Sequence, residues 1–98
     1  MMLEFTREAE GDLERIADYI AADNPLRALT VIRELRVKCE GLTDNPKRFA
    51  LVPRYEQHGV RRRVHGNYVI FYRVEEDRVV ILHVLHGATD YGSLLFDE

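Results

Sequence analysis

The stretch Val60-Arg-Arg-Arg-Val-His-Gly-Asn-Tyr-Val-Ile-Phe-Tyr-Arg-Val74 decides how this chain folds. Gly66-Asn67 is a dipeptide typical of a two-residue hairpin turn, because both residue types tolerate positive backbone φ angles. The residues on either side are rich in β-branched and aromatic side chains, which favour strands. The segment therefore predicts a β-hairpin with strands at 60–65 and 68–74.

Two further strands are expected towards the ends of the chain. Glu75-Glu-Asp-Arg78 supplies a polar turn after the hairpin, and residues 79–86 form an apolar run that Gly87 closes. Residues 2–5 mix apolar and polar side chains, which predicts a short edge strand.

Two amphipathic helices separate that edge strand from the hairpin. Thr6 and Asn24 are suited to cap their N-termini, and Pro25 suits the first position of the second helix. The inward stripes are Ala9, Leu13, Ile16, Ala17 and Ile20, then Ala28, Val31, Ile32, Leu35, Cys39 and Leu42. The short connection between the two helices predicts an antiparallel αα-hairpin.

Both faces of the last two predicted strands are apolar. Strict alternation along the last strand predicts two groups: Val79, Ile81 and Leu85 on one face, and Val80, Leu82 and Val84 on the other. Two helices can cover only one face of a sheet, so the other requires cover from the C-terminal residues or from another chain. This pattern indicates an obligate partner.

These elements predict an α+β fold of order β-α-α-β-β-β, an antiparallel sheet with the N-terminal αα-hairpin packed on one face. A length of 98 residues, 46% of them apolar, predicts a single domain over residues 1–98. No apolar run reaches the ~20 residues that cross a bilayer, so no membrane partner is expected. Residues 1–6 have neither a basic flank nor an apolar stretch of ~7–15 residues, so no secretory signal is expected. The lone Cys39 is expected to be buried, reduced and functionally silent, which indicates a cytoplasmic protein.

The net charge of −3 conceals a basic middle. Residues 46–73 contain seven Lys and Arg and one acidic residue, whereas acidic residues outnumber basic ones on both sides. Such a distribution can bind an acidic partner or a phosphate backbone. The alternative is that Arg61, Arg62 and Arg63 merely occupy a solvated strand.

A ribonuclease that uses the 2′-hydroxyl needs a base, an acid and cations on the phosphate. The residues that could supply these groups are Arg61, Arg73, His86 and Tyr91, the last two near the end of a strand. No spacing among them is diagnostic, and His83 is better explained as a strand residue. The sequence contains no zinc-type Cys/His spacing, phosphate-cradling glycine loop or nucleophile elbow, so neither a metal nor a cofactor is expected.

Taken in order, these segments resemble a known family. The run Ala9-Glu-Gly-Asp-Leu-Glu-Arg-Ile-Ala-Asp-Tyr-Ile-Ala21, then Asn24-Pro25 and Ala28, resembles the first helix and helical hairpin of the ParE toxins. Residues 60–74 are similar to that family's core hairpin, and residues 79–88 with Asp90-Tyr91 are similar to its closing strand and tail. The chain is identified as a member of the RelE/ParE superfamily.

The resemblance implies the toxin half of a bacterial type II toxin–antitoxin pair. ParE toxins act on DNA gyrase, trapping it with cleaved DNA, and are neutralised by a ParD-type antitoxin that also binds operator DNA. By this resemblance the chain inhibits gyrase by binding rather than by catalysis, and it meets operator DNA only through its antitoxin. The alternatives are a RelE-like ribosome-dependent mRNA endoribonuclease and a degenerate binding module without toxicity.

Two departures from the pattern of the RelE-like ribonucleases favour the gyrase branch. The ribonucleases typically use several Lys and Arg around the sheet, whereas this chain has only Lys38 and Lys47 as lysines. His83 and His86 stand where the ribonucleases commonly place an arginine.

Two sets of contact residues are expected. Those for the target are Arg61, Arg62, Arg63, Arg73 and Tyr91. Those for the antitoxin are apolar residues off the inward helical stripe or on the second sheet face: Leu26, Leu29, Val37, Val69, Phe71, Val80 and Leu82. Contact with the first helix is the alternative explanation for the three that lie on the second helix.

Overall fold

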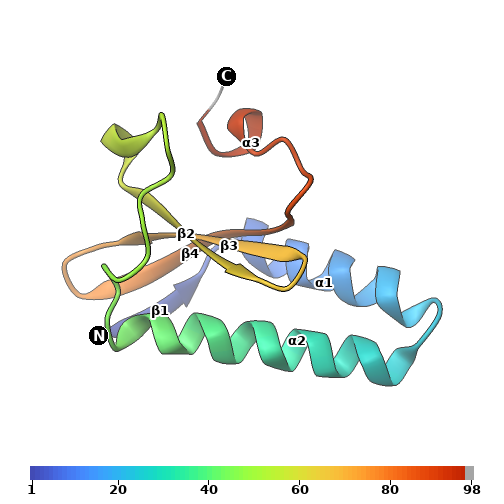
Figure 1. Ribbon diagram of the computed structural model, residues 1–98. Helices are drawn as coiled ribbons and strands as arrows, with labels where there is room; N and C mark the ends of the chain where they lie inside the picture. Colours follow the sequence, from blue (N-terminus) through green and yellow to red (C-terminus); the bar gives the residue numbers. More distant parts are fainter. Residues whose placement is uncertain (97–98) are drawn as a thin grey trace.

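The elements follow the predicted order in a computed structural model that describes residues 1–96 (Figure 1). They are β1 (Met2–Phe5), α1 (Arg7–Ala21), α2 (Pro25–Glu40), the short 3₁₀ helices η1 (Gly41–Thr43) and η2 (Glu56–His58), β2 (Val60–His65), β3 (Tyr68–Val74), β4 (Arg78–His86) and α3 (Gly92–Phe96). The expected fold class is confirmed. The 3₁₀ helices and α3 were not predicted from the sequence.

The four strands form one mixed sheet in the order β1-β4-β3-β2. The pairs β2–β3 and β3–β4 are antiparallel, as short turns require, but β1 runs parallel to β4. The expectation of a wholly antiparallel sheet is corrected in this one pair. Turn chemistry sets the direction only of strands that are neighbours in the chain, and β1 and β4 lie at its opposite ends.

Both predicted helix caps are present. The Thr6 hydroxyl accepts the backbone N–H of Ala9 over 3.0 Å, and the Asn24 side chain accepts that of Arg27 over 3.0 Å. Each bond satisfies one of the amide groups that the first turn of a helix leaves without a partner. The local signals therefore place the starts of α1 and α2 correctly.

The main core lies between the sheet and the two long helices. Its buried members come from both helical stripes and from one face of β3 and β4: Ala9, Leu13, Val31, Leu35, Cys39, Leu42, Ile70, Tyr72, Val79, Ile81 and Val84. The Tyr72 hydroxyl donates to the carbonyl of Pro46 over 2.7 Å, so this buried phenol has a hydrogen-bond partner.

A β-bulge in β4 changes which side chains share a face. Phe71 pairs with His83 but the next residue, Tyr72, pairs with Ile81, so Leu82 is an extra residue in β4. Beyond it the alternation is reversed. Val84 joins the helix-side core and Leu85 joins the opposite face, which corrects the two groups that strict alternation predicted.

Segments of this chain itself cover the middle of the second face of the sheet. Val52, Val60 and Phe71 are buried there, and Tyr55, Tyr91, Leu95 and Phe96 pack against them. Figure 1 shows α3 and the segment around η2 on the side of the sheet opposite α1 and α2. The C-terminal residues, one of the two covers expected, and the segment before β2 supply this cover, so the apolar pattern by itself does not require a partner.

Cys39 lies in the helix-side core with no exposed surface. Burial raises the pKa of its thiol to about 12, against smaller opposing effects of Arg36 and Arg63. Since the thiolate is the reactive form, we expect a thiol reagent at pH 8 to label Cys39 at least about a hundredfold more slowly in the native chain than in denaturant. Rapid native labelling would contradict this assignment.

The same shift predicts how stability depends on pH. A thiol whose folded pKa is raised binds its proton more tightly in the folded state, so the unfolded chain loses that proton first. The contribution is present below the unfolded pKa of 9.0 and is lost progressively as pH rises towards about 12. Cys39→Ala should flatten this decline in a pH series of chemical unfolding, relative to the wild type.

Candidate functional site

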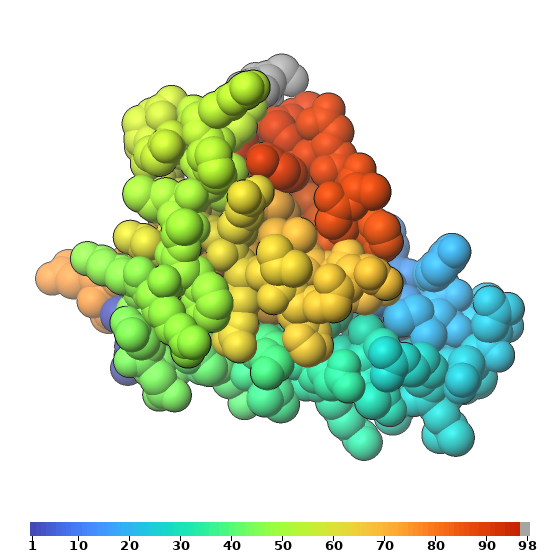
Figure 2. All heavy atoms as spheres, in the orientation of Figure 1, coloured from blue at the N-terminus to red at the C-terminus, as the bar shows by residue number. Residues whose placement is uncertain are grey.

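A cavity of about 410 Å³ opens on the face of the sheet away from α1 and α2. Its lining residues are Pro53, Arg54, Tyr55, Arg62, Thr89, Asp90, Tyr91 and Gly92. We call this cavity the arginine–tyrosine cleft. It lies where the segment before β2 meets the residues that follow β4, and Figure 2 shows these two segments side by side above the sheet.

Strand pairing places Arg62 in this cleft. Arg62 is the partner of Phe71 in the β2–β3 ladder, so both side chains lie on the face away from the long helices. The Arg62 backbone N–H donates to the carbonyl of Ala50 over 3.2 Å, which ties the preceding segment to the edge of β2. The Tyr91 ring packs 5.0 Å from that of Phe71. Two of the expected target contacts, Arg62 and Tyr91, are thus brought together.

Aromatic contacts join the two segments that flank the cleft. Tyr55 stacks on Phe96 with ring centroids 3.9 Å apart and planes nearly parallel, and His58 lies 4.9 Å from the same Phe96 ring. These contacts hold η2 against α3. The Asp90 carboxylate accepts the backbone N–H of Gly92 over 3.2 Å, which orients the start of α3.

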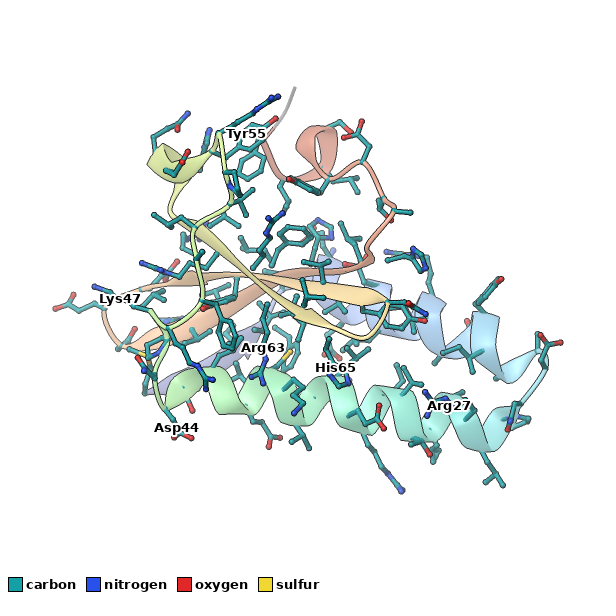
Figure 3. The ribbon with its side chains drawn as sticks, in the orientation of Figure 1. Arg27, Asp44, Lys47, Tyr55, Arg63 and His65 are labelled. Carbon is teal, nitrogen blue, oxygen red and sulfur yellow. The ribbon has the colours of Figure 1, made fainter. Side chains whose placement is uncertain are left out.

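Arg61 and Arg63 face the opposite layer. The Arg61 guanidinium donates to the carbonyl of Phe49 over 2.7 Å, and that of Arg63 donates to the carbonyl of Lys38 over 3.1 Å. Lys38 lies in the last turn of α2, whose carbonyl groups lack helical partners. Figure 3 shows Arg63 and His65 reaching from β2 towards α2. Arg61 and Arg63 are therefore separated from Arg62 and engaged with backbone carbonyls, so the three expected target contacts do not form one surface.

Arg73 and His86 lie in two other places. Arg73 is bound to Glu75, with 2.9 Å between its Nη2 atom and the carboxylate, and lines a separate cavity beside His83. His86 lies at the far end of β4, where its ring meets that of Tyr68 edge-on at 6.0 Å. Because Tyr68 packs against the helix-side core, its strand partner His86 is not on the face that carries Tyr91.

The groups that a ribonuclease would need are consequently dispersed. Arg61 and His86 lie on the helix side of the sheet, whereas Arg73 and Tyr91 lie on the other side in different cavities. General acid–base catalysis requires such groups within hydrogen-bond reach of one substrate. The structure does not assemble the expected constellation.

One histidine–carboxylate pair was not expected from the sequence. His83 Nδ1 lies 2.7 Å from Asp12 Oδ2, and Asp12 is buried. The same carboxylate oxygen accepts the backbone N–H of Val84 over 3.0 Å. The pair therefore joins α1 to the edge of β4, where β1 has already ended. No alternating or helical pattern in the sequence predicts such a contact between distant residues.

The expected antitoxin contacts divide by exposure. Leu26, Leu29 and Val37 are exposed on α2, with 81%, 49% and 60% of their surface accessible. Their spacing puts them on one outward side of that helix, and we call them the α2 stripe. Val69 and Leu82 are half-buried on the second sheet face. Phe71 and Val80 are buried within the chain, so they are corrected from contact residues to core residues.

Sequence reasoning missed Arg54 and Thr89 as lining residues of the cleft. Arg54 has a φ of 75°, a left-handed backbone conformation that is uncommon outside glycine. Its only signal in the sequence is membership of the basic middle. Thr89 lies in a loop, where no periodicity indicates direction.

Two absences hold for residues 1–96. None of their helices is long and apolar enough to cross a membrane. No three His, Cys, Asp or Glu side chains among them gather as metal ligands could.

Comparison with known proteins places this geometry in a family. Residues 3–91 match the family described as the ParE toxin of the type II toxin–antitoxin system parDE. The structure resembles a chain of the chromosomal ParDE toxin–antitoxin system from P. aeruginosa, with a TM-score of 0.71 and 25% identity over 88% of this chain and 95% of that one. It also resembles a chain of the RelBE2 toxin–antitoxin complex from Mycobacterium tuberculosis, with a TM-score of 0.65 and 26% identity over 87% and 95%. No curated protein matches the sequence significantly. Because the family match spans nearly all of its length, the chain belongs to the ParE toxins of type II toxin–antitoxin systems.

Proposed function

We propose that this toxin inhibits DNA gyrase by binding it and performs no covalent chemistry of its own. The observation that carries the proposal is the ParE family match over residues 3–91. The dispersal of the acid–base candidates supports it, because no described cavity combines His86 with Tyr91. Gyrase as the target makes the cytoplasm the place of action.

We further infer that a ParD-type antitoxin neutralises the toxin and carries the contact with operator DNA. Both similar structures come from toxin–antitoxin systems. The α2 stripe is an exposed apolar surface that such a partner would cover. An antitoxin segment with an apolar side would remove these side chains from water, which favours association.

A ribosome-dependent mRNA endoribonuclease is the second candidate. The similarity to the RelBE2 complex favours it, as does the position of the Tyr91 phenol in a cleft with two arginines. In that case Tyr91 would act as a proton-transfer group beside cations that hold a phosphate. The two candidates predict different effects of removing the Tyr91 hydroxyl.

The test compares gyrase-dependent DNA cleavage with mRNA cleavage on translating ribosomes. We expect the wild type to trap gyrase with cleaved DNA and to leave mRNA intact. Tyr91→Phe should lower gyrase-dependent DNA cleavage by less than about tenfold, because the phenol does no chemistry in this proposal. Loss of a general acid or base would instead lower the rate by about 10²–10⁴-fold. Arg62→Glu should lower gyrase-dependent DNA cleavage more than Tyr91→Phe does, since it places a negative charge in the cleft. Arg33→Glu, an equal charge reversal on exposed α2, is the control.

Cleavage of ribosome-bound mRNA that Tyr91→Phe abolishes, with gyrase untouched by the wild type, would overturn the gyrase assignment. A wild type that neither arrests growth nor acts in either assay would identify the degenerate binding module.

A further inference from the structure

The arginine–tyrosine cleft contains two guanidinium groups without partners. Among residues 1–96, neither the Arg54 nor the Arg62 side chain makes a hydrogen bond or an ion pair. By contrast, the arginines of four ion pairs each lie 3.0 Å or less from a carboxylate: Arg15, Arg36, Arg73 and Arg78. Arg62 is also half-buried, so part of its hydration shell is already removed.

Two arginines converging on one cavity are suited to an oxyanion. Guanidinium groups donate in a planar fork that matches two oxygens of a phosphate. Tyr91 and Thr89 line the same cavity and can each donate one further hydroxyl hydrogen bond. A tetrahedral phosphate can accept from several such donors at once, whereas an apolar side chain would leave them all without partners.

The negative charge of Asp90 weakens the attraction of the cleft for a phosphate. Its carboxylate also lines the cleft, so the two arginines and Asp90 together carry a net charge of only +1. The whole chain has a net charge of −3, which disfavours long-range attraction of a nucleic acid. The cleft is therefore suited to bind a phosphate that another protein already holds nearby, and it should bind free DNA only weakly, at low salt.

We propose that the arginine–tyrosine cleft binds a backbone phosphate of the DNA held by gyrase, so that the toxin contacts protein and DNA together. This inference rests on the proposed function, and it names a DNA phosphate as the ligand of Arg54 and Arg62. The α2 stripe lies on the other layer of the molecule and remains outside this contact.

The experiment measures the affinity of the purified toxin for gyrase, with and without a bound DNA duplex. We expect wild-type toxin to bind the gyrase–DNA complex about tenfold more tightly than gyrase alone, a change of the size that charge-assisted hydrogen bonds give. Arg54→Ala/Arg62→Ala should bind both forms equally. Arg27→Ala/Arg33→Ala removes the same charge from exposed α2, where Figure 3 shows Arg27, and should retain the DNA-dependent gain.

Two further arms keep the proposal separable from the gyrase assignment. Asp90→Asn keeps an oxygen to accept from Gly92 but removes the opposing charge, so it should increase the DNA-dependent gain. If no form of gyrase binds, the proposed function fails, and the cleft is then judged with a single-stranded DNA decamer at low salt. Binding of that decamer by the wild type and its loss in Arg54→Ala/Arg62→Ala would still support the phosphate site.

Three results would overturn the proposal. The first is equal wild-type affinity for gyrase with and without DNA. The second is a loss of affinity in Arg54→Ala/Arg62→Ala that is the same for gyrase with and without DNA, which would indicate that the cleft contacts protein. The third, where gyrase does not bind, is a wild type that also fails to bind the decamer. Thermal unfolding of each variant excludes a loss of folded protein as the cause.

Discussion

Replacement of Asp12 by alanine should lower the free energy of unfolding by about 3 kcal/mol. Asp12 is 4% exposed, and its carboxylate accepts from the backbone N–H of Val84 and contacts His83 Nδ1. Removing it leaves buried polar groups on β4 without a partner, and each such group costs about 1–3 kcal/mol. The bond to Arg15 contributes less, because that side chain is 71% exposed.

Chemical denaturation followed by circular dichroism measures this loss. Asp18→Ala is the control, because Asp18 is an exposed carboxylate on the same helix. It should change the free energy by less than about 0.5 kcal/mol. Asp12→Asn keeps one acceptor oxygen and should fall between the two. If Asp12→Ala were as stable as Asp18→Ala, the buried pair would not be what joins α1 to β4.

The second large effect concerns the antitoxin. Leu26→Asp/Leu29→Asp should weaken binding of the cognate antitoxin at least about a hundredfold, because it places two charges in a surface that association would desolvate. Both leucines are exposed in the isolated chain, so the fold should tolerate the change. The measurement is the affinity of purified toxin variants for the antitoxin, together with loss of neutralisation in cells.

Met2→Asp/Tyr19→Asp provides a comparison of equal charge. Met2 is 65% exposed on β1 and Tyr19 is 82% exposed on α1, and both lie outside the expected antitoxin contacts. It should leave antitoxin affinity within about threefold of the wild type, since a surface change outside an interface costs little. Wild-type affinity in the Leu26→Asp/Leu29→Asp variant would remove the α2 stripe from the interface.

Sequence reasoning succeeded where a few neighbouring residues decide the outcome. Thr6 and Asn24 cap their helices, and Gly66-Asn67 makes the hairpin turn, because each signal acts within about four residues of chain. The same reasoning could not see the bulge at Leu82, since alternation along a strand contains no information on where one residue is added. It therefore placed Val84 and Leu85 on the wrong faces.

The candidate site shows the same limit more strongly. Three consecutive arginines look equivalent in the sequence, yet Arg62 alone lies in the cleft while its neighbours bind carbonyls near α2. A strand turns successive side chains to opposite faces, so adjacency in the chain separates them in space. Arg54 joins the cleft only because the segment before β2 folds back over the sheet.

By itself, the sequence determined the order of elements, the helix caps, the hairpin and the helical residues of the helix-side core, because periodicity and local hydrogen bonding encode them. Only the tertiary structure decided that β1 runs parallel to β4, that the chain covers the middle of its own second sheet face, and that Arg54, Arg62 and Tyr91 share one cavity. The physical reason is that these features join segments far apart in the chain. Their relative placement depends on how the whole core packs, and no local preference specifies it.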